Sequence, residues 1–277
     1  MIYLFIALAA VLLLAALLIL AVRGRRNHPG LAELRGWKYA HRGLHGDGRP
    51  ENSMAAFRAA LEAGYGVELD VHLMKDGDLA VIHDASLRRT AGKDVKIEEL
   101  TAEDLKTCFL EGTQETIPLF SQVLELFAGK APLIIELKAE NNNYAALAEK
   151  ACAMMEGYEG PWCMESFDPR CVRWLRVHRP EVIRGQLAEN FVKRTVKVPF
   201  VLRFAVTHQL LNFLLLPDFV AYRFEDRKTL SNILVRNIWG VQGVTWTLRS
   251  QQDLDTATAE GWLPIFKGFR PRASIPR

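Results

Sequence analysis

The sequence lacks the cysteine, histidine and charge patterns that mark disulfide-bonded, zinc-binding and nucleic-acid-binding proteins. Only four cysteines stand among its 277 residues. None of them forms a CxxC pair, and no histidine lies at zinc-finger spacing. We therefore expect free, buried thiols in a reducing compartment. The net charge of +3 comes without a dense basic patch interleaved with aromatic residues, which argues against a nucleic-acid partner.

Charged residues, proline and glycine are also missing from residues 2–22, which consist mainly of alanine and leucine. A helix of about 20 apolar residues spans about 30 Å, the thickness of the hydrocarbon core of a bilayer. A cleaved signal peptide is the alternative, but its basic N-terminal region and a clear small-x-small cleavage site are missing. The sequence therefore predicts a transmembrane helix over residues 1–22.

Positive charge flanks this segment on one side only. No lysine or arginine precedes it, whereas Arg23, Arg25 and Arg26 follow it at once, at the start of a basic linker over residues 23–34. Because positive flanks stay in the cytoplasm, we expect a single-pass protein of the cell membrane with a cytoplasmic main domain. The same arginines could bind anionic lipid head groups on that side.

The remaining residues, 35–277, suffice for one barrel-sized domain of about 250 residues. Apolar runs of about five residues alternate there with stretches of helical period, which is typical of parallel strands joined by outer helices. The segment 84–116 is rich in charged and turn residues and is expected to form a small insertion. The predicted strands cover residues 37–41, 67–72, 79–83, 133–138, 162–167, 182–187, 219–223, 244–248 and 264–266.

Local signals mark several helices between these strands. Ser53 is expected to begin one helix, and Asp168 with Pro169 another, since proline fits the first helical turn. Ser121 is the expected N-cap of a third helix. Gly261 is a plausible C-cap of the last one.

Polar residues recur where several predicted strands end. In a closed barrel these ends meet at one mouth, which favours a TIM-like (β/α)8 barrel over an open doubly wound sheet. Strand residues i and i+2 face the same side, so paired residues on one strand project together. The clusters are His41, Glu68 with Asp70, His83, and Glu136 with Lys138.

Three of these residues, Glu68, Asp70 and Glu136, carry carboxylates that are costly to bury without a partner. Their convergence at one point would make a hard oxygen site suited to one divalent cation, Mg²⁺ or Ca²⁺.

The other polar residues suit proton transfer and phosphate binding. His41 and His83 titrate near neutral pH, as a general acid and a general base require. Arg42 and Lys138 supply positive charge for a phosphate group. Together with the cation site, these groups predict chemistry on a phosphate ester.

The order of these motifs resembles the glycerophosphodiester phosphodiesterase family. The resemblance covers roughly residues 39–247. It rests on His41-Arg42-Gly43, Pro50-Glu51-Asn52-Ser53 with Ala56-Phe57, Glu68-Leu69-Asp70-Val71, Lys75-Asp76-Gly77, Val81-Ile82-His83-Asp84, Ile117-Pro118, Glu136-Leu137-Lys138, Ser166-Phe167-Asp168 and Trp246-Thr247.

The resemblance implies a TIM-like barrel that hydrolyses glycerophosphodiesters to sn-glycerol 3-phosphate and an alcohol. It suggests attack by the glycerol hydroxyl through a cyclic phosphate, with direct attack by water as the alternative. The implied roles are metal ligands for Glu68, Asp70 and Glu136; acid and base for His41 and His83; phosphate contacts for Arg42, Glu51 and Lys138; and a substrate-side position for Trp246.

The last predicted strand departs from the family, because the run from Ile265 to Phe269 carries Lys267 and no acidic residue. This difference concerns the glycerol-side contacts. A lysophospholipase D or phospholipase acting on membrane lipids is an alternative, because substrate choice would lie in the loops and in residues 198–217. A catalytically inactive, lipid-binding barrel is another, but it predicts a missing histidine or carboxylate, and none is missing.

A second apolar stretch covers residues 198–217 but holds too many polar residues for a comfortable membrane span. An ordinary outer helix on the barrel is one interpretation. The density of leucine and phenylalanine around the whole helical circumference favours contact with membrane lipids. The residues expected to make this contact are Leu214, Leu215 and Leu216.

Overall fold

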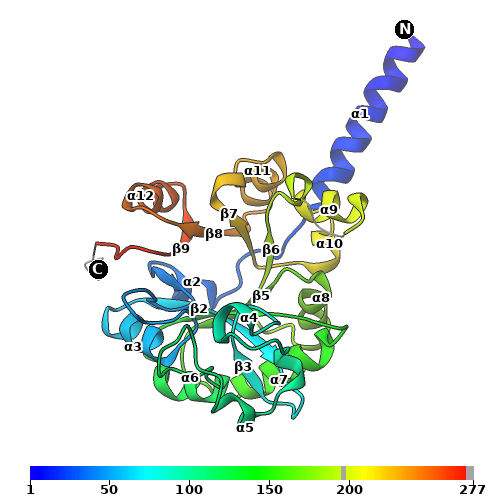
Figure 1. Cartoon of the computed structure of the whole chain (residues 1–277). Coiled ribbons are helices and arrows are strands. Elements are labelled where there is room, and N and C mark those ends of the chain that lie inside the picture. The colour runs from blue at the N-terminus through cyan, green and yellow to red at the C-terminus, as the bar shows by residue number, and fades with distance from the viewer. Residues whose placement is uncertain (195–197, 273–277) are drawn as a thin grey trace.

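Eight parallel strands close into a barrel in the computed structural model, which describes residues 1–194 and 198–272 (Figure 1). Neighbouring strands follow chain order around the barrel, and β1 closes the ring by pairing with both β2 and β9. The predicted TIM-like barrel is confirmed. Its strands are β1 Tyr39–His41, β2 Gly66–Leu73, β4 Leu133–Leu137, β5 Trp162–Ser166, β6 Arg184–Ala188, β7 Phe219–Arg223, β8 Gln242–Leu248 and β9 Trp262–Phe266.

One further strand, β3 (Leu79–Val81), lies outside the ring and runs antiparallel to β2. The strand turns back after Leu73, so that Val81 pairs with Val71 and the Ile82 N–H donates to the Asp70 carbonyl. His83 therefore reaches the mouth of the barrel through a returning hairpin. The expectation that it ends a barrel strand is wrong, although its final position at the mouth agrees.

Helices surround the barrel in a ring (Figure 1). Two predicted starts agree with the structure, since Ser53 Oγ accepts from the Ala56 N–H and Asp168 caps the helix that Pro169 begins. The predicted Ser121 cap is wrong: the helix already begins at Phe120, and Gln122 caps the Leu119 N–H. The helices packed around the barrel include α2 Leu31–Leu34, α3 Met54–Glu62, α6 Phe120–Phe127, α7 Tyr144–Met155, α8 Pro169–His178, α11 Leu230–Asn237 and α12 Gln251–Ala259.

Two apolar clusters hold the barrel together. The inner one fills the barrel and is closed at the base by Leu31 and Leu34 of α2, whose Leu34 carbonyl accepts from the Tyr39 hydroxyl. The outer one lies between the strands and the ring of helices. Such burial on both faces explains why the strand sequences are almost continuously apolar.

Residues 84–116 form a short excursion on one side of the mouth. They carry α4 (Arg88–Ala91), a 3-10 turn at Ile97–Glu99 and α5 (Ala102–Leu105). Leu87, Ile97 and Leu105 pack with Ala80 of β3 and the following Ile82 in an apolar cluster of their own. This cluster keeps the excursion fixed beside His83.

The first helix, α1 (Ile2–Ala21), is long and apolar enough to cross a membrane, and none of its residues is buried. The chain that follows it is docked on the barrel. Val22 is fully buried against Val220, Val235 and Val241. The Trp239 indole N–H donates to the Ile19 carbonyl at 2.7 Å. The joint between α1 and the barrel is therefore packed like a protein core.

Two arginines of the basic linker are used by the protein itself. Arg25 pairs with both carboxylate oxygens of the buried Asp218, at 2.5 and 2.7 Å. Arg26 donates to the carbonyls of Ile238 and Trp239. Arg23 is exposed, with its guanidinium over the Trp239 ring. Of these three arginines, Arg23 is thus the one free to meet lipid head groups.

The segment 198–217 is broken into α9 (Phe200–Thr207) and α10 (Asn212–Leu215). Leu215 is 2 % exposed, so the expectation that it contacts lipid is wrong: its side chain packs into the protein. Leu214 is exposed and Leu216 half-buried. Within this segment the most exposed apolar side chains are Val201 and Phe200 of α9.

Removing the ion pair between Arg25 and Asp218 below α1 should lower the stability of the protein measurably. Arg25→Met would leave Asp218 buried without its ion-pair partner. We expect the free energy of unfolding to fall by about 2–3 kcal/mol, less than for a fully buried pair because Arg25 keeps some contact with water. Denaturant unfolding of the full chain in detergent, followed by tryptophan fluorescence, measures the loss. The control is Arg88→Met, which removes an exposed ion pair with Asp94 and should change stability little. Equal losses in the two variants would contradict a structural role for the Arg25 pair.

Candidate active site

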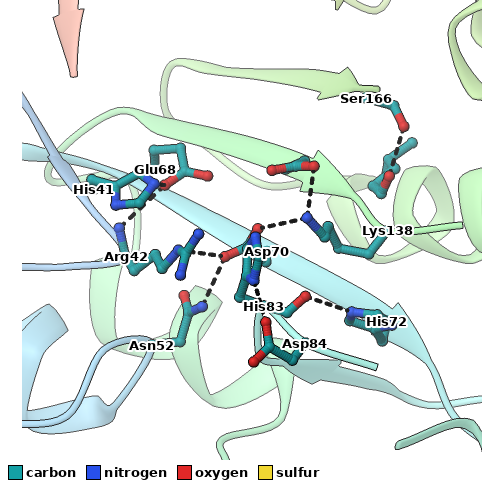
Figure 2. A network of polar contacts seen from close by, with 12 residues as sticks. His41, Arg42, Asn52, Glu68, Asp70, His72, His83, Asp84, Lys138 and Ser166 are labelled. Carbon is teal, nitrogen blue, oxygen red and sulfur yellow. Dashed lines mark hydrogen bonds and ion pairs between the residues drawn. The ribbon is translucent and has the colours of Figure 1, made fainter. Parts of the chain in front are cut away.

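Three acidic side chains converge at the mouth of the barrel (Figure 2). Glu68 and Asp70 project from the same face of β2, and Glu136 lies on β4 in register with Asp70. One oxygen of each lies within 4.8 Å of the others, and all three residues are buried. The structure thus brings together the carboxylates that the sequence singled out.

Asp70 is the most strongly compensated of the three. Its Oδ2 accepts from Asn52 Nδ2 at 2.9 Å and lies 3.3 Å from Arg42 Nε. Lys138 Nζ lies 3.6 Å from Asp70 Oδ1 and 3.0 Å from Glu136 Oε1. Burial raises the pKa of Asp70, but Lys138 and Arg42 outweigh it, so the pKa lies well below its usual value. Asp70 is therefore ionised.

The other two carboxylates carry less compensation. Burial, with Asp70 and Glu136 close by, raises the pKa of Glu68 well above its usual value. Burial also raises the pKa of Glu136 to about 7, although Lys138 lowers it. Asp70 Oδ1 accepts no hydrogen bond from the residues described. Buried carboxylate oxygens that lack a full set of hydrogen-bond or ion-pair partners are suitable ligands for a hard divalent cation.

His41 and His83 lie on either side of this cluster. His41 ends β1, and its Nε2 is 3.9 Å from Glu68 Oε2, while its Nδ1 is buried without a hydrogen-bond partner among residues 1–194 and 198–272. His83 Nδ1 lies 2.5 Å from Asp84 Oδ1. Burial lowers the pKa of both histidines, strongly for His41, whereas Asp70 and Asp84 partly oppose the shift of His83. The two imidazoles therefore differ in how readily each holds a proton.

Glu51 pairs with positively charged side chains around the site. It accepts from Arg42 Nη1 at 2.8 Å and Arg89 Nη2 at 2.6 Å, and Lys267 Nζ lies 3.5 Å away. Burial raises the pKa of Glu51, but Arg42 and Arg89 lower it to about 2. Arg42 also lines a cavity that opens above the acidic cluster. The sequence pattern named Glu51 and Arg42; it gave no signal for Arg89, which lies in the excursion.

A cavity of about 300 Å³ opens above the acidic cluster. Phe167 and Trp246 form one wall, with ring centres 5.6 Å apart in an edge-to-face arrangement. Trp246, which the sequence places on the substrate side, thus lines this cavity. His41, Arg42, Glu68, His83 and Glu136 line the same cavity.

Glu165 is a site residue that the sequence analysis missed. It lies on β5 in register with Glu136 and lines the same cavity. Its Oε2 is buried and accepts no hydrogen bond from the described part of the chain. Burial, with Glu68 and Glu136 close by, raises its pKa well above the usual value. Its position directly before Ser166-Phe167-Asp168 was the available signal.

Comparison with known proteins agrees with this geometry. Residues 41–262 match the model of the glycerophosphoryl diester phosphodiesterase family. A glycerophosphodiester phosphodiesterase of Bacillus altitudinis is 42% identical over 130 residues, covering 44% of this chain and 53% of that protein. The lysophospholipase D GDPD1 of Rattus norvegicus is 35% identical over 133 residues, covering 43% and 41%. The chain thus spans about half the length of these curated relatives.

Solved structures share the fold. A phosphodiesterase of Oleispira antarctica, solved with the product sn-glycerol-3-phosphate, aligns with a TM-score of 0.70 at 20% identity and covers 88% of this chain and 95% of that chain. A glycerophosphodiester phosphodiesterase of Thermotoga maritima aligns with a TM-score of 0.64 at 23% identity and covers 83% and 93%. With the family match across most of the barrel, the chain belongs to the glycerophosphoryl diester phosphodiesterase family.

Proposed function

We propose that this chain is a membrane-anchored, metal-dependent phosphodiesterase that hydrolyses glycerophosphodiesters to sn-glycerol 3-phosphate and an alcohol. The observation that carries the proposal is one cavity lined by two histidines, Arg42, and Glu68 and Glu136 of the acidic cluster. The activity named for the Bacillus relative and the product bound in the Oleispira structure support it. In this organisation residues 1–22 form the anchor and residues 35–277 the catalytic domain, with 84–116 as its insertion.

The proposed cation, Mg²⁺ or Ca²⁺, would be held by Glu68, Asp70 and Glu136. When bound, it would withdraw charge from the phosphate oxygens and polarise the attacking oxygen. Arg42 and Lys138 lie beside these carboxylates and would orient the phosphate through charge-assisted hydrogen bonds. Glu51 keeps Arg42 in place for this contact.

The two histidines are proposed to share proton transfer. His41 is neutral because burial lowers its pKa, so it is suited to accept the proton of the attacking hydroxyl. His83 faces the Asp84 carboxylate, which stabilises an imidazolium. His83 is therefore suited to protonate the leaving alkoxide. An inactive barrel would be expected to have lost a histidine or a carboxylate, whereas both histidines line the cavity with Glu68 and Glu136.

The first prediction is metal dependence. EDTA should abolish the release of sn-glycerol 3-phosphate by the full chain in detergent, and added Mg²⁺ or Ca²⁺ should restore it. Glu136→Gln should raise the metal concentration needed for half-maximal activity, because it removes one anionic ligand. The control is Glu103→Gln, which changes an exposed carboxylate of α5. Full activity in chelator would remove the metal from the proposal.

The second prediction concerns the histidines. His41→Ala and His83→Ala should each lower kcat by about 10²–10⁴-fold, the usual contribution of a general acid or base. Asp84→Asn should lower kcat less, because the imidazole remains. His178→Ala, on the exposed face of α8, serves as the control with an intact fold. A His41 or His83 variant with near-normal kcat would take that histidine out of the mechanism.

The third prediction is retention of α1 and a cytoplasmic barrel. Val22 and the Ile19 carbonyl belong to the packed joint, so removal of the helix as a signal sequence would expose apolar core. Mass spectrometry of the membrane-bound protein should therefore find an intact N-terminal helix. Protease added outside intact cells should leave the barrel uncut, as the flanking arginines require. Cleavage from outside would reverse the proposed orientation.

A further inference from the structure

Outside α1, most of the exposed large apolar side chains of the described chain lie on one flank of the barrel. We call this flank, made of α9, α10 and α11, the apolar flank. Val201 is 78 % exposed and Phe200 57 % on α9, and Leu230 is 61 % exposed on α11. Phe213 of α10 is exposed between them. An exposed apolar surface of this kind marks a contact with another molecule or with a membrane.

The apolar flank lies beside the base of α1. In Figure 1, α1 projects outward from the ring of helices next to α9, α10 and α11. Contacts agree with the view: α1 packs on α10, and Val22 packs on Val235 of α11. The packed joint fixes this direction, so a bilayer crossed by α1 would face the same flank. Trp239 and the exposed Arg23 stand at the joint, as residues at a membrane interface do.

Three adjacent pockets lie between the apolar flank and the active site, and we call the one under α9 the groove. A pocket of about 220 Å³, lined by apolar residues and Arg203, lies under α9; Leu202 and Val206 are on one side and Phe167 and Phe191 on the other. A larger pocket of about 640 Å³ runs on from Leu202 past Phe167 to Lys138 and Glu136. Phe167 also lines the cavity above the acidic cluster. Phe167 thus lines all three spaces, Leu202 lines the first two, and Glu136 lines the last two.

We propose that the apolar flank lies on the bilayer and that the groove under α9 receives the hydrocarbon chain of a lipid phosphodiester. This inference rests on the proposed function and names the substrate class of that site. An apolar pocket separated from phosphate-binding cations by one aromatic wall matches a molecule with a charged head and one apolar tail. The continuity of the flank with the candidate membrane span favours lipid over a second copy of this chain.

The groove is tested with the full chain in nanodiscs. Two substrates are compared that share a glycerophosphodiester head group, a single-chain lysophospholipid and its chain-free counterpart. Val206→Trp would fill the pocket under α9. The ratio of kcat/KM for the lysophospholipid over the chain-free substrate should fall at least ten-fold. The control is Phe109→Trp, an exposed apolar site in the excursion, which should leave the ratio unchanged.

The outcomes separate the two proposals. If the wild-type chain cleaves neither substrate, the proposed function fails. If it cleaves the chain-free substrate but discriminates against the lysophospholipid, the groove inference alone is wrong. An unchanged ratio in Val206→Trp also overturns it.

The membrane contact is tested by site-directed labelling. An environment-sensitive fluorophore is attached to Val201→Cys or Leu230→Cys of the full chain in liposomes, with Phe109→Cys as control. Spin-labelled lipids should quench the probes at 201 and 230 several-fold more than the probe at 109. Equal quenching at all three positions contradicts the contact. Cysteine cross-linking at 201 between two copies, without lipid quenching, would assign the flank to a dimer instead.

Discussion

The burial of three carboxylates at one end of the barrel is the constraint on which the site depends. Unpaired, these groups would carry a large desolvation cost. Lys138, Arg42 and Asn52 compensate Asp70, but Glu68 and Glu136 retain raised pKa values. A divalent cation bound between the three carboxylates would favour their ionised forms and offset the cost of burying them. The positive groups left around it are those that would meet a phosphate.

Periodicity and strand ends predict most of this arrangement. The spacing i, i+2 places Glu68 with Asp70, and parallel strands bring Glu136 to the same level. His83 shows where the reasoning is incomplete: it reaches the mouth because β3 turns back along β2. A short apolar run does not reveal whether its strand is parallel or antiparallel, since that depends on hydrogen bonds with a neighbour.

Several contacts that the sequence did not predict join residues far apart along the chain. Arg25 and Asp218 are 193 positions apart, and Trp239 reaches Ile19 over 220 positions. No local pattern predicts such pairs, because each partner is an ordinary residue in its own segment. The same limit explains why the prediction for Leu215 was wrong. The sequence shows that residues 198–217 are rich in apolar side chains, but the direction of each side chain depends on how the segment packs on α8 and the barrel.

Position along the chain explains how one flank can serve both membrane contact and substrate access. The segment with α9 begins after the carboxyl end of β6, beside the mouth, and α10 ends just before β7, at the base where α1 docks. This connection therefore runs the height of the barrel. A barrel lying on the bilayer along that flank would keep its base at the anchor and open its mouth at the lipid surface. A lipid phosphodiester could then enter sideways under α9, with its chain still in an apolar environment, while its phosphate meets Lys138 and Arg42. Such an entry avoids the cost of transferring a hydrocarbon chain through water, roughly 0.8 kcal/mol for each CH₂ group.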